Sequence, residues 1–493
     1  MRPSVFAAIF AAALLSGSAA APAASPAKAD KPAAATSGFE LPPLPAAVDR
    51  DQSAVVDGHA LKYTVDVGWL PVRDDRGKAI AQVVYTAYTI PGKHRPATFA
   101  FNGGPGASSV FLNFGAIGPK IVSFRVNGDT PSEPATLHDN PSTWLGFTDL
   151  VFIDPVGTGY SRSLVGDKQS TKDFYSTDAD IHYLSQIVYD WLVKNGRMES
   201  PKYITGESYG GFRGPRITHY LQTRLGVAMN GMVLVSPYLD PMAWMTTLPS
   251  IAAAHLEREG KLTAANMAPI IAYTRGEYAE TLMKGRSDPA AYTAMIRKVT
   301  ELTGLDPTFV EQSGGRLETQ AYLREVYRSE GKLGSRFDSN FTAWDPFPYA
   351  PRQRSGDPIL NGITAPTTTA MVHFVTQTVG WKFDGQYQTL NYKVGRLWHD
   401  DDDAGQGSVK QLRESVANDP NLRVLIAHGW DDLSCPFMVS VPAVDQMPAM
   451  GDPTRVEVKE YPGGHMFYAR PASDAMFVKD VHALFDARTG TRS

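Results

Sequence analysis

The sequence contains a single cysteine, Cys435, so no disulfide bond can form within the chain. The same count excludes zinc and iron–sulfur sites built from several cysteines. An excess of charge of one sign is also lacking: the net charge of −4 gives no reason to expect nucleic acid or an anionic membrane surface as a partner. Hydrophobic residues make up 43% of the chain, an ordinary value for a soluble globular protein, so a hydrophobic core must stabilise the fold without cross-links.

Long hydrophobic runs are absent apart from residues 5–15, which are too few to span a membrane. Arg2 precedes this run and small residues follow it, a pattern typical of a secretory signal peptide. We therefore expect residues 1–21 to be a signal peptide, cleaved near Ala20–Ala24, and the protein to be secreted or periplasmic in a bacterium. Residues 22–45 are rich in alanine and proline and predict a disordered linker.

The central motif of the chain is Gly206-Glu207-Ser208-Tyr209-Gly210, which has the pattern Gly-x-Ser-x-Gly. A short β-prone segment precedes it at 201–205, and residues 212–225 are long enough for a helix. Strand, sharp turn and helix are the setting in which this pattern forms a nucleophile elbow that exposes the serine hydroxyl. By itself the motif is also compatible with a glycine–serine turn that has no chemical role.

Strands and helices alternate on both sides of this motif, which predicts a mostly parallel central sheet covered by helices. We expect residues 46–240 to form the first part of this α/β core and residues 393–493 to form the second part. Between them, at 241–392, the strand pattern stops and several helical segments follow. We interpret this insertion as an all-helical cap over the active site.

A glycine-rich loop at 102–109 follows a predicted buried strand at 97–101. α/β-Hydrolases form half of their oxyanion hole at such a loop. Phosphate binding is the rival interpretation, but the G-x-x-x-x-G-K pattern is missing. A second loop, at 154–161, also follows a predicted strand, and ligand sites gather at the carboxyl ends of strands in open α/β sheets.

A serine nucleophile needs a base, and the base needs an orienting carboxylate, in the chain order Ser, Asp or Glu, then His. Asp432 and His465 follow late predicted strands and satisfy this order with Ser208. Asp431 is an equally suitable acid by composition, and His428 is the nearest competing histidine, although it precedes the acid.

The sequence resembles the serine carboxypeptidase family, whose members have the α/β-hydrolase fold. Five segments carry the resemblance, from about residue 80 to the C-terminus and only weakly across the insertion: Asn102-Gly103-Gly104-Pro105-Gly106-x-Ser108-Ser109, Asp154-x-Val156-Gly157-Thr158-Gly159-Tyr160-Ser161, Gly206-Glu207-Ser208-Tyr209-Gly210-Gly211, Gly429-x-x-Asp432-x-x-x-Pro436 and Gly464-His465-Met466.

The resemblance implies a catalytic triad of Ser208, His465 and Asp432, because the family pattern has a proline four residues after the catalytic aspartate. It also implies an oxyanion hole made by the backbone amides of Gly104 and Tyr209. In the family, the asparagine of the glycine loop and the glutamate before the serine bind the terminal carboxylate of the substrate.

These carboxylate-binding residues correspond to Asn102 and Glu207, with the Gly103 amide assisting. The family's second carboxylate-binding glutamate falls on Ala116, which leaves the paired-carboxyl arrangement incomplete. Like charges at contact raise one pKa strongly, so a complete pair would favour acid conditions.

The leading hypothesis is therefore a secreted serine-type carboxypeptidase that acts on peptides with a free C-terminal carboxylate. An esterase or acyltransferase on the same scaffold is the alternative, favoured by Ala116. A catalytically inactive envelope protein that binds partners through the cap is a third hypothesis. The triad chemistry implies no metal and no organic cofactor. The sequence is silent on the oligomeric state.

Overall fold

The computed structural model describes residues 41–92, 94–122, 135–240, 245–401 and 407–489. The proposed signal peptide and all but the last few residues of the proposed linker lie outside these ranges. No helix within the described ranges is long and apolar enough to cross a membrane.

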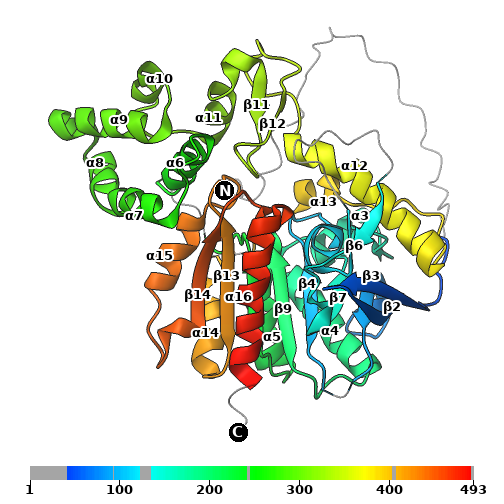
Figure 1. Ribbon diagram of the computed structural model, residues 1–493. Helices are drawn as coiled ribbons and strands as arrows, with labels where there is room; N and C mark the ends of the chain where they lie inside the picture. The colour runs from blue at the N-terminus through cyan, green and yellow to red at the C-terminus, as the bar shows by residue number, and fades with distance from the viewer. Residues whose placement is uncertain (1–40, 93, 123–134, 241–244, 402–406, 490–493) are drawn as a thin grey trace, which may run out of the picture.

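A ten-stranded sheet forms the centre of the molecule (Figure 1), in the order β1-β2-β3-β7-β4-β9-β10-β13-β14, with β8 paired to β3. Its strands are β1 (Val48–Val56), β2 (His59–Arg73), β3 (Ala79–Thr89), β4 (Ala97–Phe101), β7 (Asp149–Ile153), β8 (Arg162–Ser163), β9 (Lys202–Glu207), β10 (Gly231–Val235), β13 (Arg423–Gly429) and β14 (Val456–Tyr461). The strands from β7 to β14 pair in parallel, and β1, β2 and β3 add an antiparallel end. This arrangement confirms the predicted α/β-hydrolase fold with a mostly parallel sheet.

Helices cover both faces of the sheet. Strands such as β4, β7 and β10 carry apolar side chains on both faces, and these side chains need cover on each side. One face packs against α4 (Thr177–Lys194), α5 (Tyr209–Arg224) and α14 (Val409–Asn418). The other face packs against α16 (Pro471–Thr489) and against a segment that continues from α12 (Pro358–His373) into the π-helix η7 (Phe374–Val379). The smaller helices of the core are α2 (Val110–Leu112), α3 (Asp167–Phe174), α13 (Tyr392–Leu397) and α15 (Ser440–Asp445).

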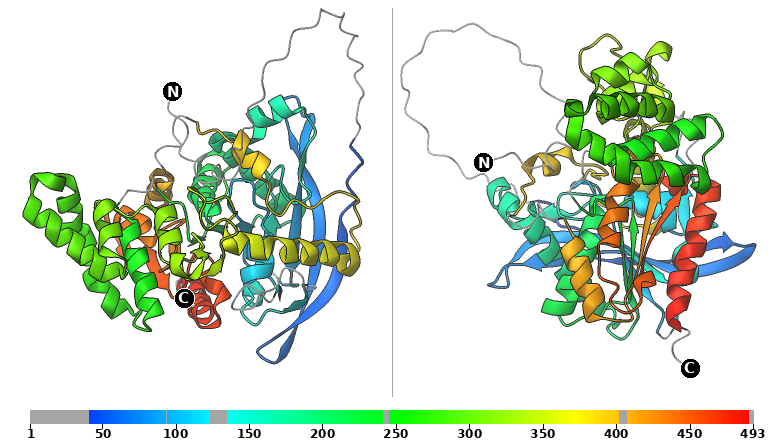
Figure 2. Two further views of the ribbon diagram at one scale, coloured as in Figure 1. Left: turned by 90° about the horizontal axis from the view of Figure 1, so that it is seen from above. Right: turned by 90° about the vertical axis from the view of Figure 1, so that its left-hand side faces the viewer.

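The first helices of the insertion form a lobe beyond the carboxyl ends of the strands (Figure 2). They are α6 (Thr247–Arg258), α7 (Ala264–Tyr273), α8 (Ala279–Lys284), α9 (Pro289–Thr303), α10 (Pro307–Gln312) and α11 (Thr319–Glu325). Most of this lobe has a hydrophobic cluster of its own, which includes Leu248, Tyr278 and Met295. The helices α12 and η7, although they belong to the same insertion in the sequence, pack against the sheet instead.

The prediction of an all-helical insertion is wrong in one place. Two short strands, β11 (Lys332–Gly334) and β12 (Thr342–Trp344), form an antiparallel pair within it. Each strand has only three residues, so neither is long enough to show an alternating hydrophobic pattern in the sequence. The segment between these two strands contacts the loop of the predicted catalytic histidine: the carbonyl of Phe337 accepts a hydrogen bond from the backbone amide of His465 at 2.5 Å.

A cluster of charged side chains joins the insertion to the core. The Arg470 guanidinium contacts Glu257 of α6, lies 2.7 Å from Asp338 Oδ2 and 3.8 Å from Asp431 Oδ2. Burial alone would raise the pKa of Glu257, but the neighbouring Asp431 carboxyl and Arg470 lower it to about 2. Burial beside these carboxylates raises the pKa of Asp431 well above its usual value. Arg470 is therefore the cation shared by Glu257 and Asp338 at this junction, with the Asp431 carboxyl at a longer distance.

We expect Arg470→Met to destabilise the protein by about 2 kcal/mol, because it leaves partly buried carboxylates without their cation. The measurement is the urea midpoint of unfolding. Lys284→Met is the control, since Lys284 pairs with Glu280 on the exposed face of α8, and its midpoint should not change. Equal midpoints for the two variants would contradict the assigned role of Arg470.

Candidate active site

Ser208 lies at the sharp turn between β9 and α5. Its backbone has φ 61° and ψ −122°, in the left-handed region that residues with side chains rarely adopt. The turn needs its glycines: a Cβ on Gly206 would lie 2.0 Å from the Gly210 carbonyl oxygen, and one on Gly210 would lie 2.2 Å from the Phe101 carbonyl oxygen. The residues thus form the strand, turn and helix that the Gly-x-Ser-x-Gly pattern predicts.

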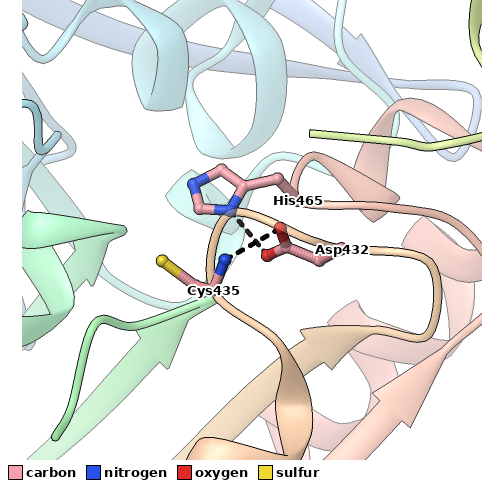
Figure 3. Close-up of side chains that lie close together, drawn as sticks. All are labelled: Asp432, Cys435 and His465. Atoms are coloured by element: carbon pink, nitrogen blue, oxygen red, sulfur yellow. Dashed lines mark hydrogen bonds and ion pairs between the residues drawn. The ribbon is translucent and has the colours of Figure 1, made fainter. Parts of the chain in front are cut away.

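Asp432 and His465 come together from the loops after β13 and β14. His465 Nδ1 lies 2.7 Å from Asp432 Oδ2, and both side chains are buried (Figure 3). The other oxygen of Asp432 accepts hydrogen bonds from the backbone amides of Ser434 and Cys435 at 2.7 and 3.0 Å. Asp432, and not the neighbouring Asp431, is the carboxylate bonded to His465. The imidazole of the competing candidate, His428, is bonded to Ser440.

The Cys435 thiol lies beside both Ser208 and the Asp432–His465 pair. Burial raises the pKa of this thiol well above its usual value, and the Asp432 charge adds to the effect, whereas a hydrogen bond with the Ser208 hydroxyl opposes it. In the described part of the chain, no direct hydrogen bond joins the Ser208 hydroxyl to His465. Catalytic hydrogen bonds are commonly loose without substrate and tighten in the complex.

Asp432, Cys435 and His465 are also the one group of three potential metal ligands that the described ranges contain, with ligand atoms within 4.8 Å of one another. Both Asp432 oxygens already take part in hydrogen bonds, one with His465 and the other with the backbone amides of Ser434 and Cys435, so an ion could bind this carboxylate only by displacing them.

The glycine-rich loop lies directly against the elbow. A Cβ on Gly103 would lie 2.5 Å from the Tyr209 backbone nitrogen and 2.9 Å from Ser208 Cβ, so only glycine permits this approach. Gly104 has φ 106°, again a conformation that favours glycine. The predicted oxyanion amides of Gly104 and Tyr209 thus belong to two segments in contact, one of which begins helix α5.

Glu207 is a buried carboxyl at the centre of a polar group next to the triad. Its Oε2 accepts hydrogen bonds from Asn102 Nδ2 at 3.1 Å and from the Tyr468 hydroxyl at 2.8 Å, and its Oε1 lies 3.9 Å from His465 Nε2. The Asn102 side-chain oxygen accepts from the Leu112 amide at 2.9 Å, which fixes the orientation of the amide group. The two residues predicted to bind the substrate carboxylate are therefore hydrogen-bonded to each other.

A buried ion pair supports the elbow from below, and sequence reasoning missed it. Arg213 of α5 binds Asp180 of α4 through two hydrogen bonds, of 2.6 and 3.2 Å, and donates a third, of 2.7 Å, to the Asn102 carbonyl oxygen. Neither charged side chain is appreciably exposed. The guanidinium also lies 4.9 Å from the centre of the Tyr209 ring. The available sequence signal was weak: one charged residue near the start of each helix, with nothing local to show that the two would meet.

The pKa of His465 reflects the same neighbours. Burial would lower it, but the charge and hydrogen bond of Asp432 and the charge of Glu207 outweigh burial, so the pKa lies above its usual value. Burial raises the pKa of Glu207, although nearby His465 and the donors Tyr468 and Asn102 oppose this. A carboxyl that holds its proton to higher pH than usual thus adjoins a histidine that does the same.

The mostly parallel sheet, with Ser208 at the turn after β9 and the Asp432–His465 pair on the loops after β13 and β14, has the architecture of the α/β-hydrolase fold. The sequence profile of the serine carboxypeptidase family (Peptidase_S10) matches residues 58–468, well over half of the chain. The protein therefore belongs to the serine carboxypeptidase family. The match runs through the insertion, where the resemblance in the sequence was weak.

Curated relatives match only in part. "Serine carboxypeptidase-like 50" of Arabidopsis thaliana is 30% identical over 188 residues, which cover 36% of this chain and 39% of that protein. The "pheromone-processing carboxypeptidase kex1" of Schizosaccharomyces pombe is 30% identical over 147 residues, which cover 30% of this chain and 26% of that protein. Among solved structures, the Saccharomyces cerevisiae prohormone-processing carboxypeptidase Kex1(Δ)p has a TM-score of 0.49 and 16% identity, and the match covers 78% of this chain and 77% of that one.

We expect Asp180→Asn to destabilise the protein by about 3 kcal/mol, because it leaves the Arg213 charge buried without its partner. The elbow and the Asn102 loop should also lose their fixed geometry, so hydrolysis of an ester substrate should fall with the urea midpoint. Asp190→Asn is the control, since Asp190 lies on the same helix and accepts a hydrogen bond from Gln186, far from the elbow in the chain. A stable, fully active Asp180→Asn variant would contradict the supporting role of the pair.

We expect Glu207→Gln to shift the acid limb of ester hydrolysis to lower pH. The change removes a negative charge 3.9 Å from His465 Nε2, so the pKa of His465 falls and the neutral base persists at lower pH. The measurement is kcat/KM for a methyl ester from pH 4 to 8, with Glu457→Gln on the exposed side of β14 as the control. An unmoved limb, or one shifted to higher pH, would contradict the electrostatic coupling.

Proposed function

We propose that this protein is a serine-type carboxypeptidase that releases C-terminal amino acids from peptides through an acyl-enzyme. The observation that carries the proposal is Glu207, a buried carboxyl bonded to Asn102 beside the Asp432–His465 pair. A buried carboxyl at this point is costly, and a plain esterase has no need of it.

In the proposed reaction the Ser208 hydroxyl attacks the carbonyl carbon of the last peptide bond. His465 Nε2 takes the hydroxyl proton and gives it to the nitrogen of the leaving amino acid, while Asp432 holds the imidazole through Nδ1. The backbone amides of Gly104 and Tyr209 stabilise the oxyanion, aided by the N-terminus of α5. Water, deprotonated by His465, then attacks the acyl-enzyme and releases the shortened peptide.

Recognition of the substrate carboxylate is assigned to Asn102, the Gly103 amide and Glu207. An ionised Glu207 would repel the carboxylate, but a protonated one donates a hydrogen bond to it. Because burial raises the pKa of Glu207, the protonated form extends to higher pH than for an exposed glutamate. Binding of a free C-terminus should therefore be strongest at low pH and weaken as pH rises through the Glu207 pKa.

An esterase or acyltransferase on the same scaffold is the second candidate. Ala116 favours it, since the family's second carboxylate-binding glutamate is missing at this position. The remaining proposals rest on the sequence: residues 1–21 as a signal peptide of a secreted or periplasmic bacterial protein, and residues 22–45 as a linker. Residues 241–392 are proposed as an insertion between the two core parts, 46–240 and 393–493, in which the lobe of α6 to α11 forms the cap.

The test compares hydrolysis of one blocked dipeptide as its free acid, its C-terminal amide and its methyl ester, from pH 4 to 8. We expect the free acid to be preferred over the amide by about tenfold or more at low pH, because the charged carboxylate accepts a stronger hydrogen bond from protonated Glu207 than a neutral amide does. The Ser208→Ala variant should abolish all three activities. Equal hydrolysis of acid and amide would overturn the carboxypeptidase, and preference for the ester alone would favour the second candidate.

A further inference from the structure

Tyr468 occupies the space beside the position where the family's second glutamate is missing. It lies in the short 3-10 helix η11 (Phe467–Ala469), which follows the His465 loop and packs against the π-helix η2 (Asn113–Ile117). Ala116 is part of η2, and the edge of the Tyr468 ring lies 3.6 Å from where a Cβ on Gly115 would stand. The ring is buried, and its hydroxyl reaches Glu207 Oε2 at 2.8 Å.

This contact determines which oxygen of Glu207 can carry a proton. Oε2 accepts two hydrogen bonds, from Tyr468 and from Asn102, which use both of its lone pairs. While both groups donate to Oε2, the position left for a proton on the carboxyl is Oε1. That oxygen faces the catalytic histidine, at 3.9 Å from His465 Nε2.

We propose that Tyr468 is a positioning residue of the carboxylate site: by donating to Oε2, it directs the Glu207 proton to Oε1, the oxygen on the side of the triad where a substrate carboxylate would be bound. The Tyr468 hydroxyl thus takes the place, as the partner of Glu207, of the second glutamate that the family has at the position of Ala116. This inference rests on the proposed carboxypeptidase function and names a residue which that function does not yet include.

The surroundings of Tyr468 and Glu207 keep the Tyr468 hydroxyl a hydrogen-bond donor from pH 4 to 8. Burial raises the pKa of Tyr468 well above its usual value, and Glu207 and Asp474 add to the effect, so the hydroxyl stays a donor. The groups that act on Glu207 are His465, Tyr468 and Asn102, which lower its pKa, and Asp432, which raises it. Loss of the Tyr468 hydroxyl removes a donor that favours the ionised carboxylate, so the Glu207 pKa should rise further.

The test is Tyr468→Phe, assayed with the free acid and the methyl ester of one blocked dipeptide from pH 4 to 8. We expect KM for the free acid at low pH to rise about tenfold, the value of one hydrogen bond to a group of this kind, with kcat changed less than about twofold. Ester hydrolysis should stay within about twofold. The pH at which the free-acid KM begins to increase should move upward, since the variant keeps Glu207 protonated to higher pH.

Tyr461→Phe is the matched control. Tyr461 is also buried and its hydroxyl also donates to a carboxylate, Asp480 Oδ2 at 2.7 Å, but on helix α16 and not in the site. This variant should leave the free-acid KM and its pH profile unchanged.

The outcomes separate the two proposals. A wild-type enzyme that does not prefer the free acid over the amide overturns the carboxypeptidase and this inference with it. A wild-type enzyme with that preference, together with a Tyr468→Phe variant of unchanged KM and pH profile, overturns the inference alone. Equal losses with acid and ester, or loss of all activity, would assign Tyr468 a purely structural role and also overturn it.

Discussion

The buried ion pair between Arg213 and Asp180 is the interaction on which the site depends. It joins α4 to α5, and through the third hydrogen bond of Arg213 it ties the elbow helix to the carbonyl of Asn102. Two ions are costly to bury, so such a pair is weak evidence for stability by itself. Its consequence here is geometric: the serine turn and the glycine loop, about a hundred residues apart in the chain, are held by one guanidinium.

The loops after β13 and β14 carry Asp432 and His465, and contacts with other segments fix these side chains as well. Asp432 is fixed by two backbone amides and His465, while its neighbour Asp431 points to Arg470 and the insertion. Adjacent carboxylates thus serve different purposes, one orienting the histidine and the other facing the cap. The same Arg470 packs against Gly463, two residues before His465, so the attachment of the insertion and the position of the base are linked.

Glu207 connects the triad to the proposed recognition of a chain end. Its hydrogen-bond partners Asn102 and Tyr468 come from the loop after β4 and from the segment after β14, far apart in the chain. Ala116 stands where the family has its second glutamate, and the Tyr468 ring lies against the neighbouring Gly115.

The sequence alone determined what depends on local chemistry. The glycines around Ser208, the glycine loop at 102–109 and the alternation of strands and helices predicted the elbow and the parallel sheet, because turns and periodicity are set by neighbouring residues. Tertiary structure decided what depends on contacts between distant segments. Only the fold shows that Arg213 is buried against Asp180, that Tyr468 reaches Glu207, and that α12 packs on the sheet and not in the lobe. The choice of Asp432 over Asp431 had already followed from Pro436 through the family pattern, and the fold confirms the pairing with His465. Charge and hydrogen-bond partners at long range leave no periodic signal, since they are fixed only when the loops at the ends of β9, β13 and β14 meet.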